Sequence, residues 1–77
     1  MSYYIVTIEQ IKTDGKLSEY GKIEKVDDYS TALSKFYTKL ANVSADLDKN
    51  HTYMHIQIVN SEGYENKSET LGAYVKE

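Results

Sequence analysis

The chain of 77 residues contains no cysteine and no arginine, and each absence excludes classes of protein. Without cysteine there is no disulfide, no thiolate nucleophile and no cysteine-ligated zinc, and this absence fits an intracellular protein. Arginine is the preferred residue for bidentate contacts to phosphates and base edges. The nine lysines are spread along the chain against twelve acids, with a formal net charge of −3. The sequence therefore predicts neither nucleic-acid recognition nor a strongly acidic DNA mimic.

Long apolar runs and targeting signals are missing as well. The N-terminal residues show no basic leader and no apolar stretch of membrane-spanning length, so we expect a cytoplasmic protein without a membrane partner. The length predicts a single domain (1–77), and a domain of this size buries only about 60% of the surface of its unfolded chain. Such a small core must be well packed or completed by a second copy of the chain.

Alternating β-branched and aromatic residues over 3–12 predict a first strand. Asp14-Gly15 predicts a hairpin turn after it, because glycine tolerates the positive φ that such turns require. Residues 17–26 predict the return strand, and Gly21 within it indicates a bulge or an edge position.

The middle of the chain predicts one amphipathic helix over residues 29–47. Asp27 and Asp28 precede it, and an acidic side chain can accept from the free N–H groups of a first helical turn. The apolar positions recur at three- and four-residue steps, which is typical of a helix packed on a sheet. They are Leu33, Phe36, Leu40, Val43 and Leu47.

Residues 52–59 predict a third strand, 60–63 a turn suited to a hairpin with a bulge, and 64–77 a closing strand. The order is ββαββ. Because the helix returns the chain to the starting end, the third strand can lie antiparallel beside the first. The predicted fold is α+β, with a four-stranded antiparallel sheet in the order 2-1-3-4 and one helix on one face.

One helix cannot cover both faces of such a sheet, and the first strand is apolar on both. Two assignments therefore fit, and the cleaner alternation places the helix over Tyr4, Val6, Ile8, Met54, Ile56 and Ile58. The opposite face then carries the candidate interface residues Tyr3, Ile5, Tyr53, His55 and Val59. An antiparallel sheet tolerates such a face in water, or uses it as an interface. The eight tyrosines of the chain favour an interface, where tyrosine is enriched.

The stretch DLDKNHTYMHIQ (46–57) begins like a calcium-binding loop, with Asp46, Asp48 and Asn50 at alternate positions. A helix-loop-helix calcium site needs glycine at the sixth position and glutamate at the twelfth, which are His51 and Gln57 here. If residues 51–55 are extended, the two histidines, His51 and His55, lie roughly 13 Å apart, too far for one ion. We expect no metal site, and interpret the stretch as the polar exit of the helix.

Catalytic patterns are weak throughout. No serine lies in a nucleophile-elbow pattern, and the four glycines form no phosphate-binding loop. A domain with one helix also has little room for a deep pocket. We therefore expect no enzyme, no catalytic residues and no cofactor.

The motifs "YYIVTI", "ALSKFYTKL" and "MHIQIVNSEG" resemble those of a group of short proteins from low-GC Gram-positive bacteria and their phages. The matching positions are Tyr3, Tyr4, Val6, Ala32, Phe36, Asn60 and Gly63. The resemblance covers nearly the whole chain and implies a phage or mobile-element accessory protein. The group has no assigned activity, and a histidine that often follows its helix phenylalanine is Tyr37 here.

Three functions remain as hypotheses. The first is a non-enzymatic protein-protein interaction module that forms a homo-oligomer through the second sheet face. The second is a phage-encoded inhibitor that binds a host defence protein or nuclease. The third and weakest is single-stranded nucleic-acid binding by tyrosines stacked on bases, which the missing arginines and negative charge disfavour.

Overall fold

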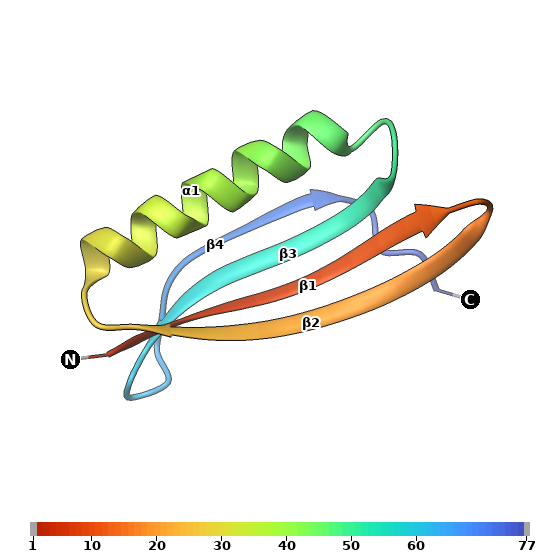
Figure 1. Cartoon of the computed structure of the whole chain (residues 1–77). Coiled ribbons are helices and arrows are strands. Elements are labelled where there is room, and N and C mark those ends of the chain that lie inside the picture. The colour runs from red at the N-terminus through yellow and green to blue at the C-terminus, as the bar shows by residue number, and fades with distance from the viewer. Residues whose placement is uncertain (1, 77) are drawn as a thin grey trace.

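Two long hairpins, joined by one helix, share a single sheet in the computed structural model, which describes residues 2–76 (Figure 1). The elements are β1 (Tyr3–Thr13), β2 (Lys16–Val26), α1 (Tyr29–Asp46), β3 (His51–Asn60) and β4 (Glu65–Gly72). The antiparallel strand order is β2-β1-β3-β4, with the two most apolar strands in the centre. The predicted α+β fold, element order and sheet order are confirmed.

The turn between β1 and β2 fixes the register of the first hairpin. Asp14 and Gly15 both adopt positive φ, 52° and 80°, as a two-residue turn matched to the twist of the strands requires. The pairing then runs unbroken from Thr13 opposite Lys16 to Tyr3 opposite Val26. Because the register has no shift, Gly21 is not a bulge; it lies in an edge strand, the other predicted possibility.

The second hairpin turns at Asn60, whose side-chain carbonyl oxygen accepts from the N–H groups of Glu62 and Tyr64. Gly63 has a φ of 88°, and the register shifts between Ile58 and Val59, which confirms the predicted bulge.

The strand predicted for 64–77 is too long, because β4 ends at Gly72. Gly72 has a φ of 72°, and a Cβ at this residue would lie 2.2 Å from the carbonyl oxygen of Thr52. Only glycine fits this close approach, and from here the chain leaves the ladder.

Helix α1 begins as predicted, because the carboxylate of Asp28 accepts from the N–H of Thr31 at 2.7 Å. This backbone hydrogen bond holds the pKa of Asp28 below its ordinary value. The helix packs across the sheet, mainly over β3 (Figure 1). Its most deeply buried residues are Ala32, Phe36 and Val43, and its leucines are partly buried against the same core.

The core lies between α1 and one sheet face, and it corrects the face predicted for β1. Ile5 is buried with Met54, Ile56 and Ile58 beneath the helix, and the ring centroid of Tyr3 lies 5.2 Å from that of Tyr29. The assignment on β3 is confirmed. The assignment on β1 is wrong, because Tyr4, Val6 and Ile8 point away from the helix.

None of the helical residues within 2–76 forms a segment long and apolar enough to cross a membrane.

Candidate functional site

Within residues 2–76, no helix or strand packs over the sheet face away from α1, called the open face below (Figure 1). Its side chains alternate with the core residues along the strands, because neighbouring side chains of a strand point to opposite sides. In the centre, four cross-strand pairs of β1 and β3 make up this face. They are Tyr4 with Val59, Val6 with Gln57, Ile8 with His55, and Gln10 with Tyr53.

These eight central positions include no aspartate, glutamate or lysine, although the chain carries nine lysines and twelve acids. When one face of an antiparallel sheet lies in water, polar residues on that face ordinarily alternate along each strand with apolar residues of the core. Here Ile8 keeps 40% of its surface exposed. The centre of the open face is therefore an apolar surface with a few neutral hydrogen-bonding groups, such as His55, whose Nδ1 lies 2.7 Å from the Thr70 hydroxyl. On β2, Glu19 and Lys25 lie beside this centre, opposite Gln10 and Tyr4.

Strand β2 adds a notch to the open face. Gly21 pairs with Ile8 and Ile23 pairs with Val6, so a position without a side chain lies among three aliphatic ones. Ile23 is 69% exposed. A hollow is lined here by Val6, Thr7, Ile8, Gly21, Lys22 and Ile23. The notch is a shallow hollow open to solvent, with Val6, Ile8 and Ile23 around it.

The five residues predicted as an interface are divided between the two faces. Tyr53, His55 and Val59 lie on the open face. Tyr3 and Ile5 lie beneath the helix, and Ile5 is only 5% exposed, so neither belongs to this surface. The sequence prediction missed their neighbours on β1, which are Tyr4, Val6 and Ile8.

One end of the open face is covered by the chain itself, which the sequence did not predict. Residues 73–76, called the C-terminal strap below, run from the end of β4 towards the β1–β2 hairpin (Figure 1). Gln10 holds the strap: its Nε2 donates to the Val75 carbonyl at 2.7 Å, and the Val75 N–H donates back to its Oε1 at 2.8 Å. The Tyr74 hydroxyl donates to Glu19 at 2.6 Å, which raises the pKa of Tyr74.

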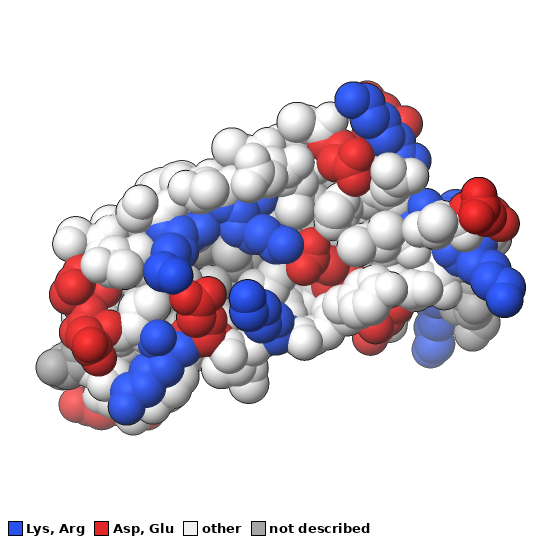
Figure 2. Space-filling model, in the orientation of Figure 1, with Lys and Arg blue, Asp and Glu red and all other residues white. Residues whose placement is uncertain are grey.

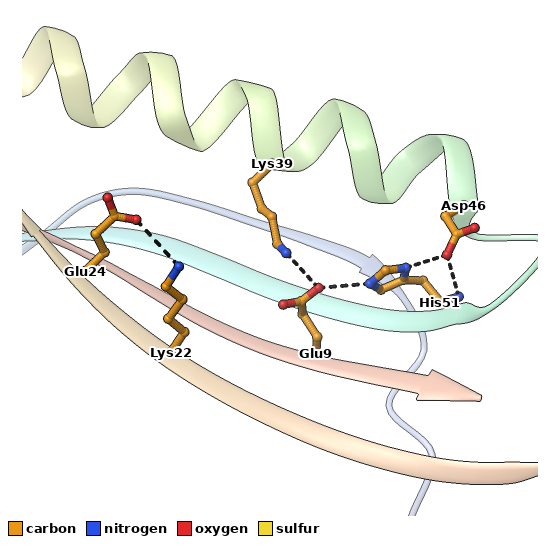
Figure 3. Close-up of polar contacts among 6 residues, drawn as sticks. All are labelled: Glu9, Lys22, Glu24, Lys39, Asp46 and His51. Carbon is orange, nitrogen blue, oxygen red and sulfur yellow. Dashed lines mark hydrogen bonds and ion pairs between the residues drawn. The ribbon is translucent and has the colours of Figure 1, made fainter. Parts of the chain in front are cut away.

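The stretch that resembles the start of a calcium loop forms a lock between the helix end and the sheet. His51 Nδ1 lies 2.6 Å from Asp46 Oδ2, and Nε2 lies 2.9 Å from Glu9 Oε1 (Figure 3). The two carboxylates therefore flank the ring from opposite sides, one beside each ring nitrogen. The hydrogen bond from the His51 ring lowers the pKa of Asp46. Lys39 pairs with the same Glu9 oxygen at 3.1 Å.

The other two residues of the calcium-like pattern lie outside this lock. Asp48 and Asn50 are exposed on the connection to β3, away from the lock contacts. Among residues 2–76, no three or more His, Asp or Glu side chains gather in a way that could hold a metal ion. The stretch 46–57 is the exit of the helix and the start of β3.

Charged side chains concentrate beside the helix. Figure 2 shows lysines and acids interspersed along the side between α1 and the sheet. Lys35 pairs with Glu24 at 2.5 Å, and this hydrogen bond holds the pKa of Glu24 below its ordinary value; Lys22 lies 4.0 Å away on the other oxygen (Figure 3). With Glu9 and Lys39, three lysines here face two glutamates, and each of these lysines has a glutamate partner.

Comparison of the chain with protein-family models, with curated proteins and with solved structures finds no match.

Proposed function

We propose that this chain is a non-enzymatic protein-interaction module that associates with a second copy of itself through the open face. The observation that carries the proposal is the absence of Asp, Glu and Lys from the eight central positions of that face. A small domain has little apolar surface to spare, and here much of it lies outside the core, on Tyr4, Val6, Ile8 and Ile23. Packing two such faces together removes this surface from water.

The size of the molecule fits this use. Its principal extents are 42 × 23 × 15 Å, so the broad side of the sheet matches the ~800 Å² that each partner contributes to a standard interface. Two copies each carry a formal charge of −3, and they repel least where the contact contains no acids. A second copy therefore fits a neutral face better than it fits the charged rim.

The edges of the sheet favour face-to-face contact. Strand β2 carries Lys16, Glu19, Lys22, Glu24 and Lys25, and β4 carries Glu65, Lys67 and Glu69. Charged side chains on edge strands oppose edge-to-edge pairing with another sheet. Sheets that pack face to face instead lie about 10 Å apart, with interdigitated side chains. The notch at Gly21 is a place where such a side chain fits.

The resemblance to phage and low-GC Gram-positive proteins supports a role as an accessory protein of a phage or mobile element. Nucleic-acid binding is less well supported: Tyr4 and Tyr53 offer rings for stacking, but the central positions around them carry no lysine for the phosphates.

The test compares two exposed apolar residues of β2 that point to opposite faces. Ile23 lies on the open face, opposite Val6, whereas Tyr20 lies on the other side, opposite Glu9, and is 55% exposed. Light scattering from micromolar to millimolar concentration should show a dimer for the parent chain. Ile23→Lys should weaken it about tenfold or more, because a charge then enters an apolar contact. Tyr20→Lys should leave it unchanged.

A parent chain that stays monomeric at every concentration would contradict self-association. It would redirect attention to a foreign protein as the occupant of the open face, in keeping with the inhibitor hypothesis. Equal weakening by both lysine substitutions would show that the dimer uses a different surface.

A further inference from the structure

Gln10 is the most deeply buried polar residue on the open face, with 2% of its surface exposed. Its amide group pairs with both the N–H and the carbonyl of Val75, as one peptide group pairs with another in a sheet. The same Nε2 lies 3.3 Å from Glu19 Oε1. A buried amide is costly unless its donors and acceptors are satisfied, so this position needs an extended segment across it.

The segment that satisfies Gln10 is only lightly attached. Tyr74 and Val75 are 52% and 44% exposed. Besides the Gln10 contacts, the strap has a 3.3 Å hydrogen bond from Ala73 N–H to the Thr52 carbonyl, the Tyr74 bond to Glu19, and an edge-on contact between Tyr74 and Tyr53. A cavity of about 240 Å³ remains beside it, over Leu17. The strap occupies this site without filling it.

We propose that the strap is exchanged between two copies, so that Tyr74 and Val75 of one chain bind Gln10, Glu19 and Tyr53 of the other. This inference rests on the proposed self-association and names a contact that would hold the two copies together. An exchanged segment makes the same contacts as it makes in its own chain, so the exchange costs little beyond a change in its hinge. Gly72 is a suitable hinge, because glycine adopts many backbone conformations that other residues cannot.

The reach of the strap matches the geometry of two packed sheets. Gly72 and Gln10 both pair with Tyr53, so they lie at the same level of the sheet on either side of it. A twofold axis parallel to the strands and passing over β3 places Gln10 of the partner opposite Gly72. From Gly72 to Val75 there are three extended steps, about 10 Å in total, which is the distance between two packed sheets.

Exchange depends on the open faces meeting first. Within one chain the strap has a high effective concentration at its own Gln10, because it follows directly on Gly72, the last residue of β4. A second Gln10 competes only when the partner sheet is held against the first. The exchanged form therefore belongs to the dimer and not to the free chain.

The closing experiment uses the full chain without substitutions. Equal amounts of ¹³C,¹⁵N-labelled and unlabelled chains are mixed at a concentration where light scattering shows a dimer, and isotope-filtered NOEs are recorded. The ring centroids of Tyr53 and Tyr74 lie 5.2 Å apart, so exchange should give an NOE between these rings in different chains. A dimer in which this NOE arises only within one chain overturns the exchange and leaves the proposed function intact. A monomer at all concentrations overturns both.

Two variants at one position give a second measurement. Val75→Pro removes the N–H that donates to Gln10, whereas Val75→Ala keeps it and trims a half-exposed side chain. In the mixed-label sample, Val75→Pro should abolish the NOE between Tyr53 and Tyr74 of different chains, whereas Val75→Ala should keep it, because only the proline variant lacks the bond that seats the strap on Gln10. If Val75→Ala also shows no NOE between different chains while its dimer persists, the strap is not exchanged and the proposal is overturned.

Discussion

The two faces of this sheet are built from alternate residues of the same strands, yet they are stabilised in different ways. Beneath α1 lie Ile5, Met54, Ile56 and Ile58, all buried, and charged pairs surround them at the rim. On the open face the aliphatic residues of β1 and β2 remain in contact with water, and the central positions carry no acid or lysine. Charged pairs therefore flank the covered face, whereas on the open face Glu19 and Lys25 of β2 lie beside the uncharged centre, opposite Gln10 and Tyr4.

The two faces differ in what covers them. The covered face gains its stability within one chain, since Phe36 and the β3 isoleucines exclude water without help. The open face has the same kind of side chains without a layer over them. A second layer from another copy would turn its half-buried residues into a core like the first.

The largest effect on the free energy of unfolding should come from truncating a core isoleucine to alanine, compared with the same substitution of an isoleucine on the open face. Ile56 is fully buried beneath the helix, whereas Ile8 is 40% exposed on the open face of the neighbouring strand. Ile56→Ala should lower the free energy of unfolding by about 2–5 kcal/mol, because it leaves a cavity. Ile8→Ala should cost about 1 kcal/mol or less in a dilute monomer. Denaturant unfolding at low protein concentration measures both.

The concentration dependence sharpens this comparison. At high concentration the loss from Ile8→Ala should grow, because the parent chain gains stability from association and the variant gains less. Equal losses for the two variants at low concentration would mean that the open face is already a core within one chain.

The second largest effect on stability should come from comparing alanine substitutions of two glycines: Gly72, where the strap begins, and Gly21, in the notch of β2. A Cβ at Gly72 would overlap the Thr52 carbonyl at 2.2 Å, and its φ is positive. Gly72→Ala should therefore lower the free energy of unfolding by on the order of 1–3 kcal/mol and release the strap. At Gly21 the nearest atom to an added Cβ is the Thr7 carbonyl oxygen at 3.9 Å, so Gly21→Ala should be tolerated.

Gly21→Val completes the measurement by filling the notch. Its β-branched side chain suits a strand, so thermal unfolding of the dilute chain should not fall. Light scattering should nevertheless show a weaker dimer if the notch receives a side chain of the partner. A dimer that is equally strong with valine would show that the notch lies outside the contact.

The fold could be predicted from the sequence because its signals are local. The turn at Asp14-Gly15, the acidic cap at Asp28 and the three- and four-residue spacing of the helix stripe each depend on nearby residues, and each is confirmed. The strand order followed because a helix that returns the chain to its start brings β3 beside β1.

The face of β1 was predicted wrongly because alternation cannot decide between two apolar sides. A signal was nevertheless available in the hairpin register. A two-residue turn at Asp14-Gly15 places Val26 opposite Tyr3, and the helix begins three residues after Val26. An apolar residue so close to the start of the helix is expected to pack beneath it. Tyr3, which pairs with Val26, and Ile5, two residues further along β1, then lie on the same face as Val26.

The strap had no comparable signal. Its contacts join residues 65 positions apart, Gln10 and Val75, and they use a side-chain amide as a substitute for a backbone partner. No periodicity reports such a contact. The glycine at position 72 was visible in the sequence, but its positive φ follows from the close approach of Thr52, which only the folded chain shows.

The third effect concerns the lock beside the covered face. The His51 side chain is 16% exposed and bridges Asp46 at the helix end to Glu9 on β1. His51→Ala should lower the free energy of unfolding by about 1–3 kcal/mol, because two carboxylates lose their donor. Hydrogen exchange should report the loss first at the C-terminal turns of α1. His55→Ala is the control, since the His55 ring has a single hydrogen bond among the described side chains, to Thr70, and its loss should have little effect in the dilute chain.

The smallest effects come from pH, which should loosen the two faces at opposite ends of the scale. Beside the covered face, hydrogen bonds lower the pKa values of Asp28, Asp46 and Glu24. These bonds contribute stability above the ordinary carboxyl pKa of about 4, and the contribution is lost as the pH falls through the lowered values. On the open face the bond to Glu19 raises the pKa of Tyr74. That contribution is present below about pH 10 and is lost as the pH rises through the raised value.

Aromatic NMR signals should therefore show Tyr74 leaving Tyr53 in alkali while α1 stays folded, whereas acid should loosen the ends of α1 while the strap remains bound. If the strap and α1 respond together in both acid and alkali, they form one cooperative unit, and the open face does not loosen independently of the covered face.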